Sequence, residues 1–143
     1  MKLNNLLIVT CLSFATALSV ASCKKSSSGS SSKLVGTWKD VQSGYDMNGN
    51  GVMDAGEMSA DTFGTVTVTF NGNGTGSEHV VIPGFFDSTV AITKWTLSNG
   101  DKDLTITDAA GQTAFTHVTT LTGTDLVIAD TTNPVSWTAF KKQ

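Results

Sequence analysis

Alternation of apolar and polar residues with a period of two, interrupted by short turns, constrains this chain more than any other feature. Residues 65–70 read Thr-Val-Thr-Val-Thr-Phe, so Val66, Val68 and Phe70 share one face of an extended segment. Asn71-Gly72-Asn73-Gly74 follows, and Asn-Gly between alternating runs is a strong hairpin signal. The pattern predicts antiparallel strands with one apolar and one polar face.

The same alternation recurs through the rest of the chain and predicts eight strands. They are rich in Thr, as expected of β-branched residues that fit a pleated, half-buried surface. Eight antiparallel neighbours close naturally into a barrel and so remove exposed strand edges. We therefore predict an all-β fold, an eight-stranded antiparallel up-and-down barrel, over residues 33–143. The predicted strands are Leu34–Val41, Thr65–Phe70, Thr75–Ile82, Thr89–Ser98, Leu104–Thr107, Thr113–Leu121, Leu126–Ala129 and Val135–Lys141, with Phe115, His117, Thr119 and Leu121 on one face.

The N-terminus has the layout of a secretory signal, with Lys2 before an apolar run, Leu6–Val20, that is too short for a comfortable membrane span. The run ends in Val20-Ala21-Ser22-Cys23, which resembles the bacterial lipobox. That resemblance implies a lipoprotein signal peptide over residues 1–22 and a lipid on Cys23. The alternative is ordinary secretory cleavage beside an incidental Cys. Cys11 lies in the removed segment, so the mature chain has no second Cys for a disulfide.

Residues 23–32 follow as a Ser-rich segment, which predicts a flexible tether. It resembles the tethers of Bacteroidetes lipoproteins. Lys24 rather than Asp follows the Cys, which favours the outer membrane. Acidic residues after the Cys are associated with surface export in that phylum. None is present, which favours the periplasmic face over the cell surface.

The first predicted strand contains Leu34-Val35-Gly36-Thr37-Trp38, which resembles the Gly-x-Trp signature of lipocalins. With the strand count, the lipobox and the terminal Phe140-Lys141-Lys142, the chain resembles the lipocalin-like lipoproteins of Bacteroidetes. The resemblance implies that Trp38 caps the closed end of the barrel. The chain has no Arg to stack on it, so Lys141 or Lys142 is the expected substitute. Trp38, Trp95 and Trp137 are predicted in the core, because large aromatics dominate small cores.

Residues 46–57 resemble the calcium loop of an EF-hand, whose ligand positions are 1, 3, 5, 7, 9 and 12, with Gly at 6. Gly51 takes the turn, and Met53 is expected to pack against the domain. Three carboxylates in one small loop repel one another unless a cation lies between them. The alternative is a surface turn, since Gly, Asn and Asp suit turns. The ligand positions hold Asp46, Asn48, Asn50, Val52 (through its carbonyl), Asp54 and Glu57.

The segments that flank this loop differ from those of an EF-hand. A strand precedes it, and after it Met58–Asp61 has room for at most one turn of helix. We therefore expect a structural calcium ion without the EF-hand fold. The ion would order the long connection to the strand that begins at Thr65, since loops of that length need something to stiffen them.

Charge and residue spacing exclude two classes of protein. Without Lys2 the mature chain has eight Lys against twelve Asp and Glu, a formal charge of −4. A nucleic-acid module would present a basic face with Arg, so that class is excluded. His79 and His117 lie on separate predicted strands, and Glu78 points away from His79. Without a convergent catalytic constellation we predict that the protein is not an enzyme.

Two functions remain. The first is an envelope-anchored, lipocalin-like binding lipoprotein with a structural calcium ion and a small apolar ligand. The alternative is an accessory or structural module with a filled barrel that recognises a protein or glycan partner. Phe85 and Phe86 are the candidates for ligand or partner contact, unless one of them folds over the barrel end as a plug. An eight-stranded barrel holds side chains or one small ligand, and we expect a monomer.

Overall fold

The computed structural model describes residues 31–61, 63–131 and 135–143. The predicted signal peptide, Cys23 and residues 23–30 of the tether lie outside the described residues. The last two residues of the predicted tether instead begin a short helix, α1 (Ser31–Leu34). Within the described ranges, no helix is long and apolar enough to cross a bilayer.

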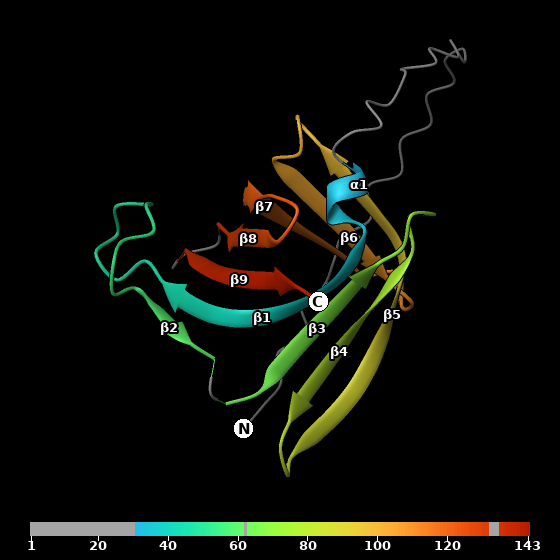
Figure 1. Cartoon of the computed structure of the whole chain (residues 1–143), viewed down its shortest axis with the longest axis horizontal. Coiled ribbons are helices and arrows are strands. Elements are labelled where there is room, and N and C mark those ends of the chain that lie inside the picture. Colours follow the sequence, from blue (N-terminus) through green and yellow to red (C-terminus); the bar gives the residue numbers. More distant parts are fainter. Residues whose placement is uncertain (1–30, 62, 132–134) are drawn as a thin grey trace, which may run out of the picture.

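The described chain forms a closed antiparallel barrel (Figure 1). Each strand from β3 onward pairs with the next, and β1 pairs with both β3 and β9 to close the ring. The prediction of an eight-stranded antiparallel barrel is therefore confirmed, with β2 as an additional short strand beside β1. The strands are β1 (Gly36–Tyr45), β2 (Met58–Ala60), β3 (Thr65–Phe70), β4 (Gly76–Ile82), β5 (Phe86–Ser98), β6 (Asp103–Asp108), β7 (Thr113–Leu121), β8 (Asp125–Asp130) and β9 (Ser136–Lys142).

β1 differs most from its predicted range, beginning two residues later and ending four residues later than the alternation suggested. A bulge between Asp40 and Gln42 lets β1 change neighbours part-way along. Its first half pairs with β3, its second half pairs with β2, and β9 runs along the opposite edge. The pairing with β9 reaches Tyr45 and so extends the strand beyond Val41.

One end of the barrel is closed by α1 and Trp38, and we call it the closed end. The side chains of Leu34 and Trp38 are fully buried, and Trp38 Nε1 donates to the Leu34 carbonyl at 2.7 Å. Lys142 lies opposite Trp38 on β9, with Nζ 5.1 Å from the ring centroid, and donates to the Lys33 carbonyl at 3.0 Å. Lys142 is therefore the cation that covers the tryptophan, as one of the two alternatives predicted.

The core extends from this end and contains all three tryptophans, as predicted. Trp95 packs edge-on against Phe70, with ring centroids 5.6 Å apart. Its Nε1 donates to the carbonyls of Asn71 and Thr75 in the β3–β4 turn, so the buried indole N–H is satisfied. These contacts join the β3–β4 turn to β5.

The predicted face of β7 is wrong. Thr119 lies in a bulge between Val118 and Thr120, which moves the strand out of strict alternation. Val118 is buried, whereas Phe115 is 55% exposed and stacks edge-on against His117. Phe115 and His117 therefore face outward, while Leu121, on the far side of the bulge, packs against the core.

The opposite end of the barrel, which we call the open end, is formed by loop 46–57 and the turns at 83–85 and 109–112. In Figure 1 the tip of the β4–β5 hairpin lies on the far side of the molecule from α1. Phe86 and Val90 share the inner face with buried Ile92, yet they are 51% and 43% exposed. Apolar side chains on the inner face of the barrel thus remain accessible at this end.

Candidate functional site

Loop 46–57 connects β1 to β2 and projects from the barrel beside β9 (left in Figure 1). Its first residue is anchored by the bond from Asp46 N to the Val135 carbonyl, 2.9 Å. Gly49 and Gly51 have φ values of 74° and 72°, a region that Gly adopts without steric cost. The chain therefore curls tightly where the sequence predicted it would.

The carboxylate of Asp46 organises the first half of the loop. Oδ1 accepts the N–H groups of Gly49 and Asn50 at 2.6 and 3.1 Å, and Oδ2 accepts that of Gly51 at 2.7 Å. A carboxylate has about four lone-pair sites, so roughly one is left for another partner.

The side chains of Asn48, Asn50 and Asp54 converge. Both amide nitrogens donate to Asp54 Oδ2, at 2.8 and 2.7 Å. These hydrogen bonds, led by the one from Asn48, lower the pKa of Asp54 below its ordinary value. Amide oxygens and nitrogens exchange places by a simple side-chain flip, so the same positions can present oxygens to a cation.

Glu57 closes the loop from its other end and is only 8% exposed. Its Oε1 accepts the Met47 N–H and its Oε2 accepts the Asp54 N–H, each at 3.0 Å. The bond to Asp54, three residues back, is half of a capping box, the motif that begins many helices. Here no helix follows, and the carboxylate instead ties the two halves of the loop together.

The donor set fits calcium in chemistry, because oxygens from residues spread over twelve positions lie in one curled loop. The described residues nevertheless contain no group of three His, Cys, Asp or Glu side chains arranged to hold a metal. The carboxylates of Asp46 and Glu57 each point to backbone N–H groups rather than to a common centre. Val52 contributes its N–H to Asn50 Oδ1 at 2.7 Å.

One expectation about the surroundings of the loop is wrong. Met53 is 44% exposed and does not pack into the core, because the loop projects outward from the barrel rather than folding over it. Met58–Asp61 contains strand β2 and no helical turn. β2 pairs with β1 through Gly44, where a Cβ would lie 1.9 Å from the Glu57 carbonyl oxygen. Only Gly permits this approach.

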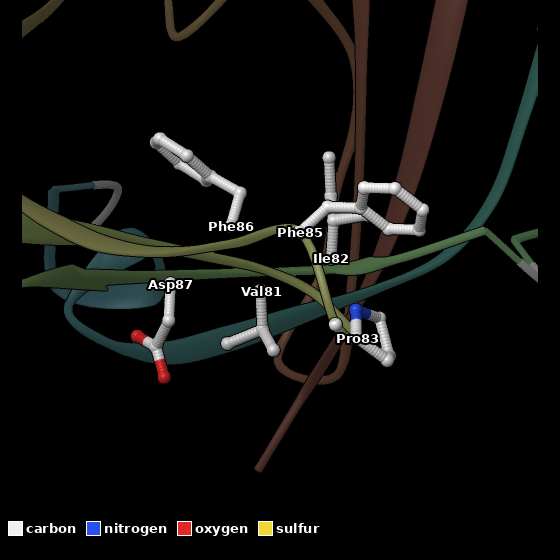
Figure 2. Close-up of a pocket in the computed structure, with 7 residues that line it drawn as sticks. Val81, Ile82, Pro83, Phe85, Phe86 and Asp87 are labelled. Atoms are coloured by element: carbon white, nitrogen blue, oxygen red, sulfur yellow. The ribbon is translucent and has the colours of Figure 1, made fainter.

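Phe85 and Phe86 lie at the tip of the β4–β5 hairpin beside a hollow of about 370 Å³. Figure 2 shows Phe86 and Asp87 pointing to opposite sides of the strand. Phe85 is 88% exposed and Phe86 51%, so neither aromatic is buried as a plug in the end of the barrel. Gly84 has φ of 78°, and the Phe85 N–H bonds to the Ile82 carbonyl at 3.0 Å to close the turn.

Two further cavities lie on the inner face. One, of about 210 Å³, occupies the place where β3 separates from β1. The other, of about 320 Å³, lies between β4–β5 and β6–β7. The first is lined by Asp40, Asp61, Phe63, Gly64, Thr65, Val66, Val80 and Ile82, and the second by Glu78, Val90, Ile106, Asp108, Gln112, Thr113 and Ala114.

Asp40 is the most buried carboxylate of the first cavity, at 8% exposure. Burial raises its pKa above the ordinary value, the Val66 backbone N–H opposes that shift, and the nearby Asp61 carboxylate reinforces it. Asp61 Oδ1 accepts the Ser43 hydroxyl at 2.5 Å. Neither Asp40 nor Asp61 was predicted from the sequence as a site residue. One signal was available for Asp40, because it stands two residues after Trp38 and so shares the apolar face of that strand.

Comparisons with known proteins agree with this architecture. Among solved structures, a lipocalin-like protein from Bacteroides uniformis aligns with a TM-score of 0.55 and 15% sequence identity, over 78% of this chain and 99% of its own. An uncharacterised protein from Bacteroides eggerthii aligns with a TM-score of 0.52 and 12% identity, over 77% and 99%. These identities establish the fold alone.

A search of curated protein sequences gave no match. The sequence model of the lipocalin-like domain matches residues 34–128, from the buried leucine of α1 into β8. That match spans the Gly-x-Trp segment, six of the eight barrel strands and part of β8, together with the open-end loops described above. The chain therefore belongs to the lipocalin-like domain family.

Proposed function

We propose that this protein is a lipid-anchored, lipocalin-like binding protein of the bacterial outer membrane that binds a small apolar ligand in the open end of its barrel. A structural calcium ion in loop 46–57 and a lipid on Cys23 complete the proposal. The proposed location is the periplasmic face of that membrane, because no acidic residues directly follow Cys23.

The accessible inner face carries the ligand proposal. Phe86, Val90 and Phe63 are exposed at the open end, and the two inner cavities adjoin apolar side chains. Ligand sites are typically concave and mostly apolar, with a few placed polar groups. A barrel filled by its own side chains would favour a different function.

Native mass spectrometry of the protein purified from its own envelope tests whether the barrel carries a ligand. The expected result is a stoichiometric small molecule that is lost on unfolding. Protein that is free of small molecules and a purified barrel that binds no apolar probe would together rule out carriage.

The calcium proposal rests on the oxygen donors of the loop. Asp46 keeps about one lone-pair site, Glu57 about two and Asp54 about two after their hydrogen bonds are counted. The ion would replace the repulsion between three carboxylates with attraction, and it would order the loop without doing chemistry. A single loop of this kind should bind calcium with a dissociation constant on the order of 10⁻⁵ to 10⁻³ M.

Titration calorimetry with calcium, against a chelator control, measures this affinity. We expect binding heat and a rise in melting temperature at ~5 mM calcium, well above that range. If neither occurs, loop 46–57 is a surface turn.

One observation favours the alternative, a module that recognises a protein or glycan partner. Phe85 is 88% exposed at the hairpin tip, next to the partly exposed Phe86. Exposed aromatic side chains are suited to contact with a partner. Phe85→Ser would then abolish capture of the partner from envelope extracts and leave ligand binding unchanged.

A further inference from the structure

The inner face of the barrel carries acidic side chains and no basic ones near its cavities. Asp40 and Asp61 line the cavity beside β3, and Glu78 and Asp108 line the cavity beside β6. None of the lysines or histidines in the described part of the chain lines either cavity. Both cavities are therefore negative and apolar at the same time.

Four basic side chains of the described chain are engaged away from the cavities. Lys141 forms an ion pair with Asp125, and Lys142 covers Trp38 at the closed end. His79 and His117 pair with Asp87 and Asp103 at 2.9 and 2.8 Å, on the outer face. Of the other lysines that the structure describes, Lys33 and Lys102 lie at the closed end, and Lys39 and Lys94 lie on the outer face of their strands. The charge of Lys39 lowers the pKa of Asp40, but by less than the Asp61 carboxylate raises it.

The cavity beside β3 combines charged and apolar lining. Asp40 and Asp61 supply carboxylates, and Phe63, Val80 and Ile82 supply apolar surface. Ile82 also lines the hollow that holds Phe86, so the apolar wall continues toward the hairpin tip. Figure 2 shows Ile82 and Phe86 on the same side of the hairpin, opposite Asp87.

We propose that the ligand of the open end is a small amphiphile with an apolar chain and a positively charged head group, bound with the charge at Asp40 and Asp61. This rests on the proposed ligand-binding function. The apolar chain lies along Val80 and Ile82 toward Phe86, and the ring of Phe63 offers a face to the cation.

Charge complementarity decides the class of ligand. An anionic amphiphile would bring a third negative charge beside the nearly buried Asp40 and its neighbour Asp61, and like charges at close range repel. A neutral amphiphile would cover Asp40 without a counter-ion, which is costly for a buried charge. A cation supplies the counter-ion and tolerates the desolvation that the apolar chain imposes.

Octylammonium, octanoate and 1-octanol share one chain and differ in head-group charge. Each is titrated into the complete mature chain carrying Cys23→Ala, which removes the competing lipid, at ~5 mM calcium so that loop 46–57 is saturated. Calorimetry gives affinities, and amide NMR shifts of Val66 and Val80 locate the site. We expect octylammonium to bind about tenfold more tightly than the other two, as hydrogen bonds to charged groups imply.

Two variants remove one charge each while keeping the side-chain shape. Asp40→Asn and Asp61→Asn should each reduce octylammonium affinity about tenfold, to the level of octanol. Asp101→Asn is the matched control. It removes the same charge in the β5–β6 turn at the closed end, where φ is 71° and Asn is tolerated. Two-dimensional amide spectra verify that each variant is folded.

Other outcomes overturn the inference. Equal binding of all three probes leaves an apolar carrier without charge preference, so the proposed function stands and this inference fails. If no probe binds and the native protein is free of small molecules, both fail. If octylammonium binding survives Asp40→Asn and Asp61→Asn, or if calcium displaces it competitively, the cationic head group does not bind at Asp40 and Asp61, and this inference fails.

Discussion

Among the charged side chains on the inner face of the barrel, Lys142 and Asp40 have contrasting partners. Lys142 has both a tryptophan ring and a backbone carbonyl. Asp40 is nearly buried and has a backbone N–H and a second carboxylate nearby, and the charge of Lys39 acts on it more weakly than that carboxylate does. The first environment favours the charged form of the side chain, whereas the second opposes it.

Lys142→Met should destabilise the barrel by about 1–2 kcal/mol, because it keeps the alkyl stem but removes one cation–π contact and one hydrogen bond. A longer or branched side chain is unsuitable at this position, because the alkyl stem of Lys142 runs closely past Gly36. A Cβ built on Gly36 would lie 2.5 Å from Lys142 Cε. Urea unfolding of the two proteins gives the difference in free energy of unfolding.

Lys94→Met removes the same charge from an exposed position on β5 and serves as the control. It should change the free energy of unfolding by less than about 0.5 kcal/mol, as is usual for surface positions. Equal effects of the two substitutions would contradict a specific role for the cation over Trp38.

Asp40→Asn should raise stability at pH 7 and alter its pH dependence. Burial raises the pKa of Asp40 in the native state above 3.8, so the native state binds a proton at higher pH than the unfolded state does. The stability linked to that proton is full below 3.8 and is lost as the pH rises through the native value. Melting temperatures from pH 7 to pH 3.5 should converge for the two proteins as the pH falls. A constant difference would contradict the assignment.

At the scale of elements, loop 46–57 and strand β2 depend on one carboxylate. Glu57 accepts N–H groups from Met47 and Asp54, and its own carbonyl lies against Gly44 of β1. Loop closure, β2 pairing and the proposed ion site therefore share a residue.

Glu57→Gln should weaken calcium binding about tenfold or more. Losing even a residue that only supports the ligands of a metal ion costs at least about tenfold in affinity. Hydrogen exchange should then be faster over residues 44–61, while amides from Thr65 onward stay protected. Measuring exchange with and without calcium in both proteins separates the loss of calcium binding from a direct loosening of the loop by the substitution. Uniform changes across all strands would mean that the ion governs the whole fold, and no change in the loop would mean that it binds no ion.

At the scale of the whole molecule, the pairing of β1 with β9 closes the barrel and α1 covers its closed end. The chain enters the barrel at this end through α1, so the residues that precede Ser31 join the molecule away from the open end. The proposed lipid on Cys23 would therefore be attached through the closed end, whereas the proposed ligand would enter at the open end.

Cys23→Ala should move the protein from the membrane fraction to the soluble fraction and abolish labelling by an alkyne fatty acid. The physical reason is that lipid chains supply the apolar area that holds a soluble domain at a bilayer. Cys11→Ala, in the segment predicted to be removed, should change neither result. A Cys23→Ala protein that keeps both the label and its membrane association would disprove lipidation at this residue.

Much of the fold followed from the sequence because the signals were local. Alternation over Thr65–Phe70 and Thr113–Leu121 placed β3 and β7 at their observed bounds, and the Asn71-Gly72 turn set β4 antiparallel to β3. The curl of loop 46–57 was also predictable, since each Asx side chain binds N–H groups within five residues. The family resemblance rested on Gly36 and Trp38 together with the strand count, the lipobox and the terminal Phe140-Lys141-Lys142, and its coarser part, the lipocalin-like domain, is confirmed.

Tertiary structure alone decided the features that depend on distant neighbours. The bulge in β7 turned Phe115 outward, because register is set by pairing with β8 and not by the strand itself. Strand β2 exists because β1 offers it an edge once β3 has separated, which a three-residue segment cannot encode. Lys142 rather than Lys141 covers Trp38 because cross-strand pairing puts it on the inner face. Asp40 and Asp61 meet in one cavity because β1 bulges at Val41, whose carbonyl accepts the Asp61 N–H at 3.3 Å. Such proximity is created by folding and has no local signal.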